Sequence, residues 1–301
     1  MVRRLSSYAL AAMLLAAIVS TACGSSTPPT QPNTPPPVVT PPANSMPAIA
    51  SITIQGKRPR QPARFADASE AVDVSVSVTD AETPVDELTY EWTSPVGTFS
   101  GTGRSVTWTA PAEVVTPADI TITLKVTERY GHPGQPKDFS QNTSATQTLS
   151  LHDSRREVGE MSVRFLTEFS KPQTNKDWRD VMRDFKASAC PRPSDYDEER
   201  GDVERHYNNF FMHSFRVDPA ATAVNFGGIC TVPTRNPLPG DACAAVPVVW
   251  DSTDLTSNTR KTTRGTDYLA AAYSVPDKRW WLCASQFIDP FTTVGHSFYS
   301  R

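Results

Sequence analysis

The stretch AVDVSVSVTD, residues 71–80, carries the pattern that decides the fold of the first half of the chain. Its four valines alternate with polar residues, so every second side chain can face a core while the others face water. The same period of two recurs in five further runs, at 52–54, 88–92, 105–109, 120–126 and 146–151. Glycine, proline and aspartate separate the runs. Residues 48–152 are therefore predicted to form an all-β sandwich domain.

Part of this region is similar to a known class of surface module. The segments LTYEWTSPVGTFSGTGRSVTWTAP (88–111) and ITLKVTERYG (122–131) resemble the PKD-type, immunoglobulin-like domains that are common on bacterial surfaces. Five residues carry the resemblance: Tyr90, Trp92, Gly97, Trp108 and Pro111. The WDFGDG motif of that family is missing from this sequence. The resemblance implies an immunoglobulin-like sandwich over residues 48–152.

Two features of this domain bear on ligand binding. We expect Trp92 and Trp108 in the sandwich core, because large aromatic side chains dominate such interiors. Four acids could supply oxygen ligands for calcium: Asp80, Glu82, Asp86 and Glu87. These acids lack the spacing of a calcium loop, however, and turns favour aspartate in any case. The sequence therefore assigns no metal site.

The first 23 residues have the pattern of an export signal. Two arginines precede an apolar run at 8–19, which is too short to remain as a transmembrane helix. Small residues follow at 20–22, and Cys23 comes next. This arrangement resembles the bacterial lipoprotein signal, with serine three residues before the cysteine where the family usually has leucine. The resemblance implies that residues 1–22 are removed and Cys23 is lipidated. Ordinary cleavage at the same place is the alternative and would leave a free thiol.

Residues 23–47 are expected to link this anchor to the folded part of the chain. Nine prolines lie among polar residues, with almost no side chain to bury. Such a segment cannot offset its ordering entropy, and it favours an extended polyproline II spacer that reaches roughly 70 Å. Glycine rather than aspartate follows Cys23, which resembles the sorting pattern of outer-membrane lipoproteins. The expected location is the bacterial cell envelope, with the membrane as partner through the lipid.

Charge and cysteine content exclude some classes of function. The chain has 29 Lys and Arg residues against 32 Asp and Glu residues, and this acidity argues against nucleic-acid binding. No cysteine and histidine spacing is typical of zinc, and no cofactor motif occurs, so we predict neither a metal nor a cofactor. Four cysteines remain besides Cys23. An even number in an exported chain predicts two disulfide bonds.

The spacing of these four cysteines favours one of their three possible pairings. Cys230 and Cys243 lie in successive expected strands on either side of a proline-rich loop, within reach of a cross-strand bridge. Cys190, at the end of an expected helix, is then left to pair with Cys283 in the last strand. The second bridge would tie the helices to the sheet.

A change of period near residue 153 predicts a second domain, at 155–298, of the α+β class. Apolar residues at helical spacing predict helices within three segments: 152–171, 175–190, with Asn175 as N-cap, and 197–215. Strand patterns follow at 223–232, 242–250, 268–275 and 279–287. This order places the helices on one face of an antiparallel sheet. The layout resembles the nuclear transport factor 2-like cone fold, whose members include small binding modules and isomerases.

Five side chains of the second domain are candidate pocket residues. Asp202, His206 and His213 fall on one stripe of the third expected helix. A stripe of this kind is typical of a solvated helix face, which is the favoured interpretation; in a pocket, an acid and a histidine could instead act as orienting group and general base. Trp280 and Trp281 point to opposite faces of the last strand. One is expected under the helices, and the other outside or lining a concavity.

The motifs of serine hydrolases, zinc proteases and nucleotide-binding loops do not occur. The polar stretch 251–267, with Arg260, Lys261 and Arg264, is expected to be an exposed loop or hairpin tip, or else a surface for an acidic partner. These observations favour a non-enzymatic binding or structural module whose partner is an envelope protein or a glycan. The alternative is a small-molecule enzyme or ligand-binding protein that uses a cone-fold pocket in the second domain.

Overall fold

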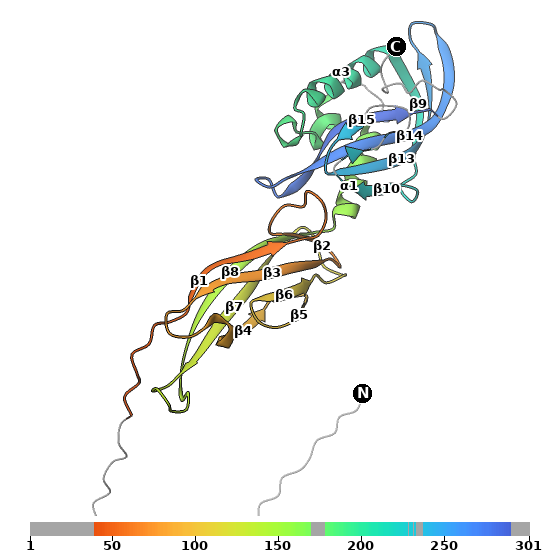
Figure 1. Cartoon of the computed structure of the whole chain (residues 1–301). Helices are drawn as coiled ribbons and strands as arrows, with labels where there is room; N and C mark the ends of the chain where they lie inside the picture. Colours follow the sequence, from red (N-terminus) through yellow and green to blue (C-terminus); the bar gives the residue numbers. More distant parts are fainter. Residues whose placement is uncertain (1–38, 170–177, 228, 231, 233–236, 290–301) are drawn as a thin grey trace, which may run out of the picture. The chain divides into compact units, whose positions relative to one another are not determined.

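A computed structural model describes residues 39–169, 178–227, 229–230, 232 and 237–289. The chain is mostly β-structure with a few helices (Figure 1). Contacts divide it after Thr40, and Pro41–Arg301 forms one compact unit. Within the described ranges, no helix is long and apolar enough to cross a membrane. The expected signal peptide, Cys23 and most of the proline-rich linker lie outside the described residues.

Residues 48–152 form two four-stranded sheets. The first has the order β1–β3–β6–β5, with strands Ala48–Gln55, Ala71–Thr79, Ser105–Thr109 and Thr98–Ser100. The second has the order β2–β8–β7–β4, with strands Phe65–Asp67, Phe139–His152, Ala118–Tyr130 and Thr89–Thr93. Neighbouring strands are antiparallel except β2 and β8. All six alternating runs of the sequence fall in these strands, so their prediction as strands is confirmed; a short 3-10 turn, η1 (Val85–Glu87), precedes β4.

The alternation along β3 explains how the two sheets pack. Val72 and Val74 are fully buried, whereas Asp73 between them is exposed. The two valines share a cluster with Trp108 of the same sheet and with Ile122 of the other sheet, so the sheets enclose a common core. Trp108 is therefore a core residue, as expected.

Gly97 allows the close approach of this tryptophan. The residue has a φ of 76°, and a Cβ built there would lie 2.6 Å from Cε2 of Trp108 and from the carbonyl oxygen of Thr109. Only glycine adopts that conformation readily and leaves room for the ring. The indole Nε1 of Trp108 donates a hydrogen bond to the Val96 carbonyl oxygen at 3.1 Å, which satisfies its polar atom inside the core.

The C-terminal region starts with helix α1 (Ser154–Phe169), which confirms the first predicted helix. Helix α3 (Ser194–Asn209) confirms the third only in part, because the predicted segment continued to residue 215. Phe210–Val217 is instead strand β9, which pairs with β13. The run FFMHSFRV suits both periods, and the sheet partner decides between them.

The second predicted helix is largely replaced by turns. Among the described residues of that segment, only Trp178–Val181 is α-helical (α2), and 3-10 turns follow at Met182–Asp184 (η2) and Ala187–Ala189 (η3). Phe185, between the turns, forms a parallel bridge with Leu282 of the last strand. That pairing requires extended backbone where the prediction had helix. The predicted cap Asn175 lies outside the described residues.

A five-stranded antiparallel sheet completes the region. Its order is β10–β13–β14–β15, and β9 also pairs with β13. The bounds are Ala223–Phe226 (β10), Ala242–Asp254 (β13), Thr259–Ser274 (β14) and Arg279–Ile288 (β15). Two short strands, Ile229–Cys230 (β11) and Leu238–Pro239 (β12), pair with each other. The polar stretch 251–267 therefore forms mainly the arms of the β13–β14 hairpin, which corrects its interpretation as a loop and confirms the hairpin.

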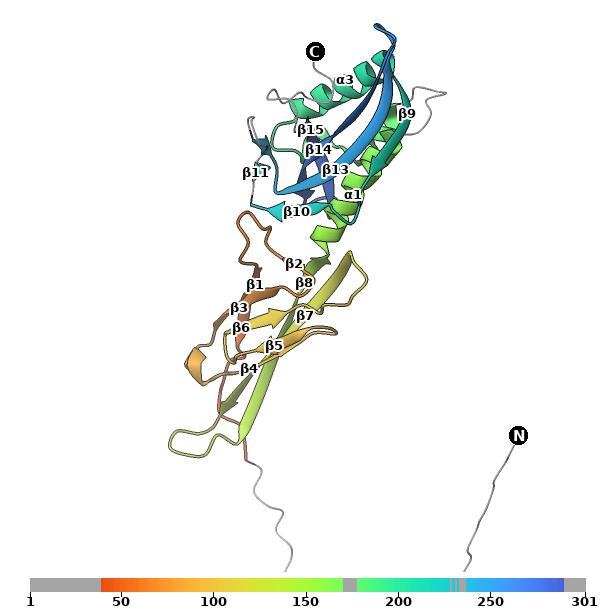
Figure 2. The ribbon, with the colours of Figure 1, turned by 90° about the vertical axis from the view of Figure 1, so that its right-hand side faces the viewer.

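Helices α1 and α3 pack against one face of this sheet (Figure 2). The main core lies between them and includes Val158, Phe165, Val203, Val246, Leu269 and Leu282. The predicted α+β layering is thus present in residues 154–288. Trp280 belongs to this core, and its indole Nε1 donates to Ser154 Oγ of α1 at 3.1 Å.

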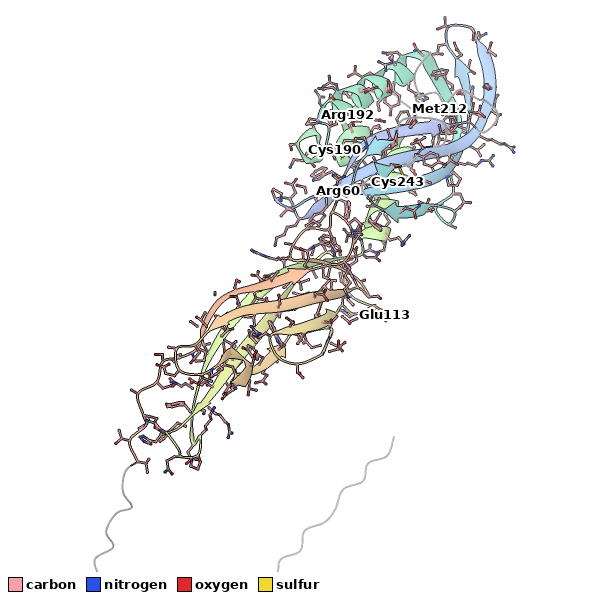
Figure 3. All side chains as sticks on the ribbon, in the orientation of Figure 1. Arg60, Glu113, Cys190, Arg192, Met212 and Cys243 are labelled. Carbon is pink, nitrogen blue, oxygen red and sulfur yellow. A yellow bond between two sulfur atoms is a disulfide. The ribbon has the colours of Figure 1, made fainter. Side chains whose placement is uncertain are left out.

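Both predicted disulfide bonds are present. Cys190 pairs with Cys283 at a Cα–Cα distance of 5.4 Å, and Cys230 pairs with Cys243 at 4.8 Å. The first bridge packs with Ala272 and the second with Ala270. Those residues alternate along β14 with residues of the main core, so the bridges cover the face of the sheet that the helices leave open. Figure 3 labels one cysteine of each bridge, Cys190 and Cys243.

Only Asp153 separates β8 from α1, and buried contacts surround that junction. His152 is fully buried, and its Nδ1 lies 2.8 Å from Glu157 while its Nε2 lies 3.0 Å from the Tyr273 hydroxyl. Its ring stacks on Phe65 at a centroid distance of 5.0 Å. Burial raises the pKa of Tyr273 to about 12, so this hydroxyl stays protonated and can donate to His152.

Candidate functional site

Helix α3 turns a row of polar side chains toward the interior. Asp195, Glu199, Asp202 and His206 are spaced by four, three and four residues, which places them on one face of the helix. All four are buried, with exposed fractions of 3–6%. The sequence-based interpretation of Asp202 and His206 as a solvated face is therefore wrong. The apolar Val203 and Tyr207 beside them bring this stripe under the sheet instead of into water.

The predicted third member of the stripe lies elsewhere. His213 is on β9, where it is exposed, and its Nε2 lies 2.8 Å from Thr253 Oγ1 of β13. The helix ends before this residue, so the expected spacing of seven from His206 no longer describes one face. Asp202 forms an ion pair with Arg205 one turn further along α3. The structure thus keeps Asp202 and His206 on one helix and separates His213 from them.

His206 lies among aromatic rings. Its ring centroid is 4.8 Å from that of Phe169 and 5.3 Å from that of Phe210. Burial alone lowers the pKa of His206 to about 3, so the imidazole is neutral at pH 7. A base this weak does not remove protons efficiently near neutral pH. The arrangement is that of a packed ring, which argues against His206 as a general base.

Glu199 connects α3 to the last strand. One carboxylate oxygen accepts the backbone N–H of Ser285 at 2.9 Å, and the other accepts its hydroxyl at 2.6 Å. Burial raises the pKa of Glu199 to about 7, although these two hydrogen bonds offset part of that rise. A carboxyl group that changes protonation near neutral pH is a common feature of functional sites.

Asp267 of β14 is the second acid in this interior. It is fully buried, and burial followed by the nearby Glu199 carboxylate raises the pKa of Asp267 well above its usual range. The backbone amides of Tyr268 and Gln286 lie near enough to lower it slightly, but neither carboxylate oxygen makes a hydrogen bond within ordinary geometry to any described residue. The strand and the helix together therefore place two acids in the same interior.

The two tryptophans of β15 take opposite faces, as predicted. Trp280 is in the main core. Trp281 is half-buried and is covered by cations of the chain itself: the Arg279 guanidinium carbon lies 3.9 Å from its ring centroid and Lys186 Nζ 5.3 Å. Its Nε1 donates to Asp277 at 3.0 Å. These contacts place Trp281 in a cluster near the start of β15, whereas Ser285, which binds Glu199, lies nearer the end of that strand.

The basic residues of 251–267 lie on the β13–β14 hairpin. Arg260 is bound to Asp251, with its Nε 3.0 Å from Oδ2, and this contact lowers the pKa of Asp251. Lys261 and Arg264 are exposed on the same strand. That the hairpin is a surface for an acidic partner stays a prediction.

The four acids that could supply calcium ligands each bind a different group of the chain. Asp80 accepts backbone amides of residues 82 and 83, and Glu82 accepts the hydroxyl of Ser45 at 3.1 Å. Asp86 pairs with Arg104 at 3.1 Å, and Glu87 pairs with Lys137 at 2.6 Å. Within the described part of the chain, no group of three acids, histidines or cysteines could hold a metal ion.

Sequence reasoning missed Glu199 and Asp267. Glu199 was one of many acids in DYDEER, and only its position relative to Asp195 and Asp202 marks it as inward. Asp267 shares the parity of Leu269 and Ala271, which are core residues of β14. An acid at one of the alternating positions of a run that are otherwise apolar was the feature of the sequence that could have revealed it. None of the known protein-family models, curated proteins or solved structures matches the chain significantly.

Proposed function

We propose that the chain is an exported lipoprotein, anchored through Cys23, whose folded part acts as a non-enzymatic binding module of the bacterial cell envelope. The observation that carries the proposal is the cysteine itself, which directly follows a short apolar segment and small residues and precedes a proline-rich spacer. A lipid on that cysteine would hold the module at a membrane while the spacer keeps it at a distance.

The disulfide bonds support export. Two bonded pairs join residues 93 and 13 positions apart, and such bonds persist in oxidising compartments outside the cytosol. The paired sheets of residues 48–152 suit the immunoglobulin-like spacer that the PKD resemblance implies. We assign binding to residues 154–288, whose helix-covered sheet suits the cone-fold resemblance, with an envelope protein, glycan or small molecule as the partner.

The test replaces Cys23 by serine in the producing bacterium. We expect the wild type to incorporate a fatty-acid probe and to partition into detergent, whereas Cys23→Ser should be unlabelled and soluble. Ser25→Ala is the matched control and should behave as the wild type. Labelling of Cys23→Ser, or a wild type that partitions into water, would refute the anchor.

A second candidate is a small-molecule enzyme, which Glu199 favours. With a pKa of about 7, this buried carboxyl could exchange a proton with a substrate at neutral pH. Its role would appear as a turnover that follows the protonation of one group near pH 7 and that Glu199→Gln abolishes. Binding without turnover, unchanged by pH in this range, would leave the binding module as the function.

A further inference from the structure

Asp267 occupies a position in the sheet where an apolar residue is expected. Its direct partners across the neighbouring strands are Val246 on β13 and Phe287 on β15, both buried in the main core. Directly paired residues point to the same face, so the Asp267 carboxylate points toward the helices among apolar side chains. The chain thus buries an acid in its core.

Two different groups flank this acid along the sheet. On one side, Leu269 pairs with Ser285, which holds the Glu199 carboxylate. On the other side, the Phe287 ring lies over Gly265, where an added Cβ would be 2.4 Å from two ring carbons. Asp267 therefore stands between a second carboxylate and an aromatic ring. Glycine at 265 is what lets the ring lie there.

Neither protonation state of Asp267 is satisfied by the described residues. As an anion, it is a buried charge beside another acid, with no cation among the described residues to pair with it; the backbone amides of Tyr268 and Gln286 lie nearby but make no hydrogen bond of ordinary geometry with it. As a neutral acid, it has a proton to donate and no acceptor in hydrogen-bond geometry. Buried polar atoms left in this condition cost about 1–3 kcal/mol each. A ligand that pairs with the Asp267 carboxyl group would remove this cost.

A primary ammonium group is a cation that can interact favourably with the Asp267 carboxylate, the Glu199 carboxylate and the Phe287 ring. It has three N–H donors to share between two carboxylates, and its positive charge compensates theirs. The face of an aromatic ring attracts the same cation. A quaternary ammonium would keep the charge but donate no hydrogen bond, and a neutral ligand would leave the carboxylates uncompensated.

We propose that Asp267 and Glu199, with the Phe287 ring beside them, form a binding site for the primary ammonium group of a small organic cation. The inference rests on the proposed function, in which residues 154–288 are the binding module, and it names the ligand class of that module. The two acids bind and orient the ammonium group; neither is assigned a catalytic step.

The test measures the unfolding temperature of the purified full-length protein with methylammonium or butylammonium chloride. At about ten times the dissociation constant, we expect a rise of about 3–6 °C, and Asp267→Asn should abolish it. Asp251→Asn is the matched control: it removes a half-buried carboxylate of the neighbouring strand, which pairs with Arg260, and should keep the full rise. Sodium chloride and tetramethylammonium chloride at the same concentration should give no rise.

Several outcomes would overturn the site. These are no rise with either primary ammonium salt, an equal rise in Asp267→Asn, an equal rise with tetramethylammonium, or a rise with calcium chloride alone. Should Asp267→Asn fail to unfold cooperatively, Glu199→Gln replaces it and must weaken ammonium binding at least about tenfold. Lipidation of Cys23 is measured separately, so loss of the ammonium site and loss of the anchor are distinct results.

Discussion

Replacing Glu199 by glutamine should change how the free energy of unfolding depends on pH. Near pH 5.5, folded Glu199, with a pKa of about 7, holds a proton. Glu199 loses that proton on unfolding, because its ordinary pKa is 4.5. Burial also raises the pKa of Asp267 well above its usual range, so Asp267 shifts stability in the same direction. His206 behaves in the opposite way: its pKa is about 3 when folded and 6.5 when unfolded, so it gains a proton on unfolding.

The sign follows from counting these protons. Glu199 holds one proton in the folded state and none in the unfolded state, so its contribution makes stability fall with rising pH by about 1.4 kcal/mol per unit between roughly pH 5 and 6.5, whereas the His206 contribution has the opposite sign. The Glu199 contribution, about 3 kcal/mol in all, is complete below pH 4.5 and is lost as pH rises to 7. Three acids that form ion pairs have lowered pKa values, are ionised in both states over this range, and cancel: Asp119, Asp251 and Asp277.

Removing the Glu199 carboxyl group changes the difference in bound protons between the folded and unfolded states by one, and so changes the slope of stability against pH. In Glu199→Gln this proton is absent from both states, and the slope of stability against pH should become less negative by about 1.4 kcal/mol per unit between about pH 5 and 6.5. Urea unfolding followed by tryptophan fluorescence at several pH values measures this. Glu160→Gln, on the exposed face of α1, is the matched control and should retain the wild-type slope. Equal slopes for Glu199→Gln and the wild type would refute the assignment of a buried, protonated Glu199.

Three further predictions concern stability. Cys283→Ala should lower the free energy of unfolding by about 4–5 kcal/mol and Cys243→Ala by about 3 kcal/mol, because the first bridge closes the longer loop. Denaturant unfolding under non-reducing conditions measures both losses. A larger loss from the shorter loop would contradict the entropic explanation. Gly97→Ala should destabilise the paired sheets by about 1–3 kcal/mol, since the new methyl group meets the Trp108 ring at a positive φ; an unchanged unfolding midpoint would count against this packing. Residues 48–153 expressed alone should unfold cooperatively in reducing buffer, and aggregation of the fragment would mean that it shares an indispensable core with the rest.

The strands of residues 48–152 could be predicted because local pattern and tertiary contact agree there. Each alternating run lies in a sheet with one face in the core, so the period in the sequence is the period of burial. Short strands such as β2 and β5 were missed because three residues carry no measurable period. The cysteine pairing was also predictable, since loop length and an even count limit the choices.

The helices were harder because a distant partner decides their ends. The run after Asn209 contains four aromatic or aliphatic residues that fit a helix or a strand, and it becomes β9 only because β13 lies beside it. The segment after α2 leaves helical geometry at Phe185 to pair with the last strand. Local propensity cannot report contacts with strands that are more than thirty residues away in sequence.

The candidate site shows most clearly where sequence reasoning fails, because its two acids are buried, whereas acids are normally expected at the surface. Sequence reasoning assigns acids to the surface, so it placed Asp202 and His206 in water and passed over Asp267 inside a strand. Each of these residues is in fact buried. Burial of an acid without a partner lowers stability, and a sequence selected for folding alone would place an apolar residue at 267, as it does at 269 and 271. If Asp267→Leu, which removes the charge at a core position, raises the unfolding temperature while abolishing the response to butylammonium, then this acid is retained for binding. If the same substitution lowers the unfolding temperature, Asp267 stabilises the fold and the ammonium site loses its main support.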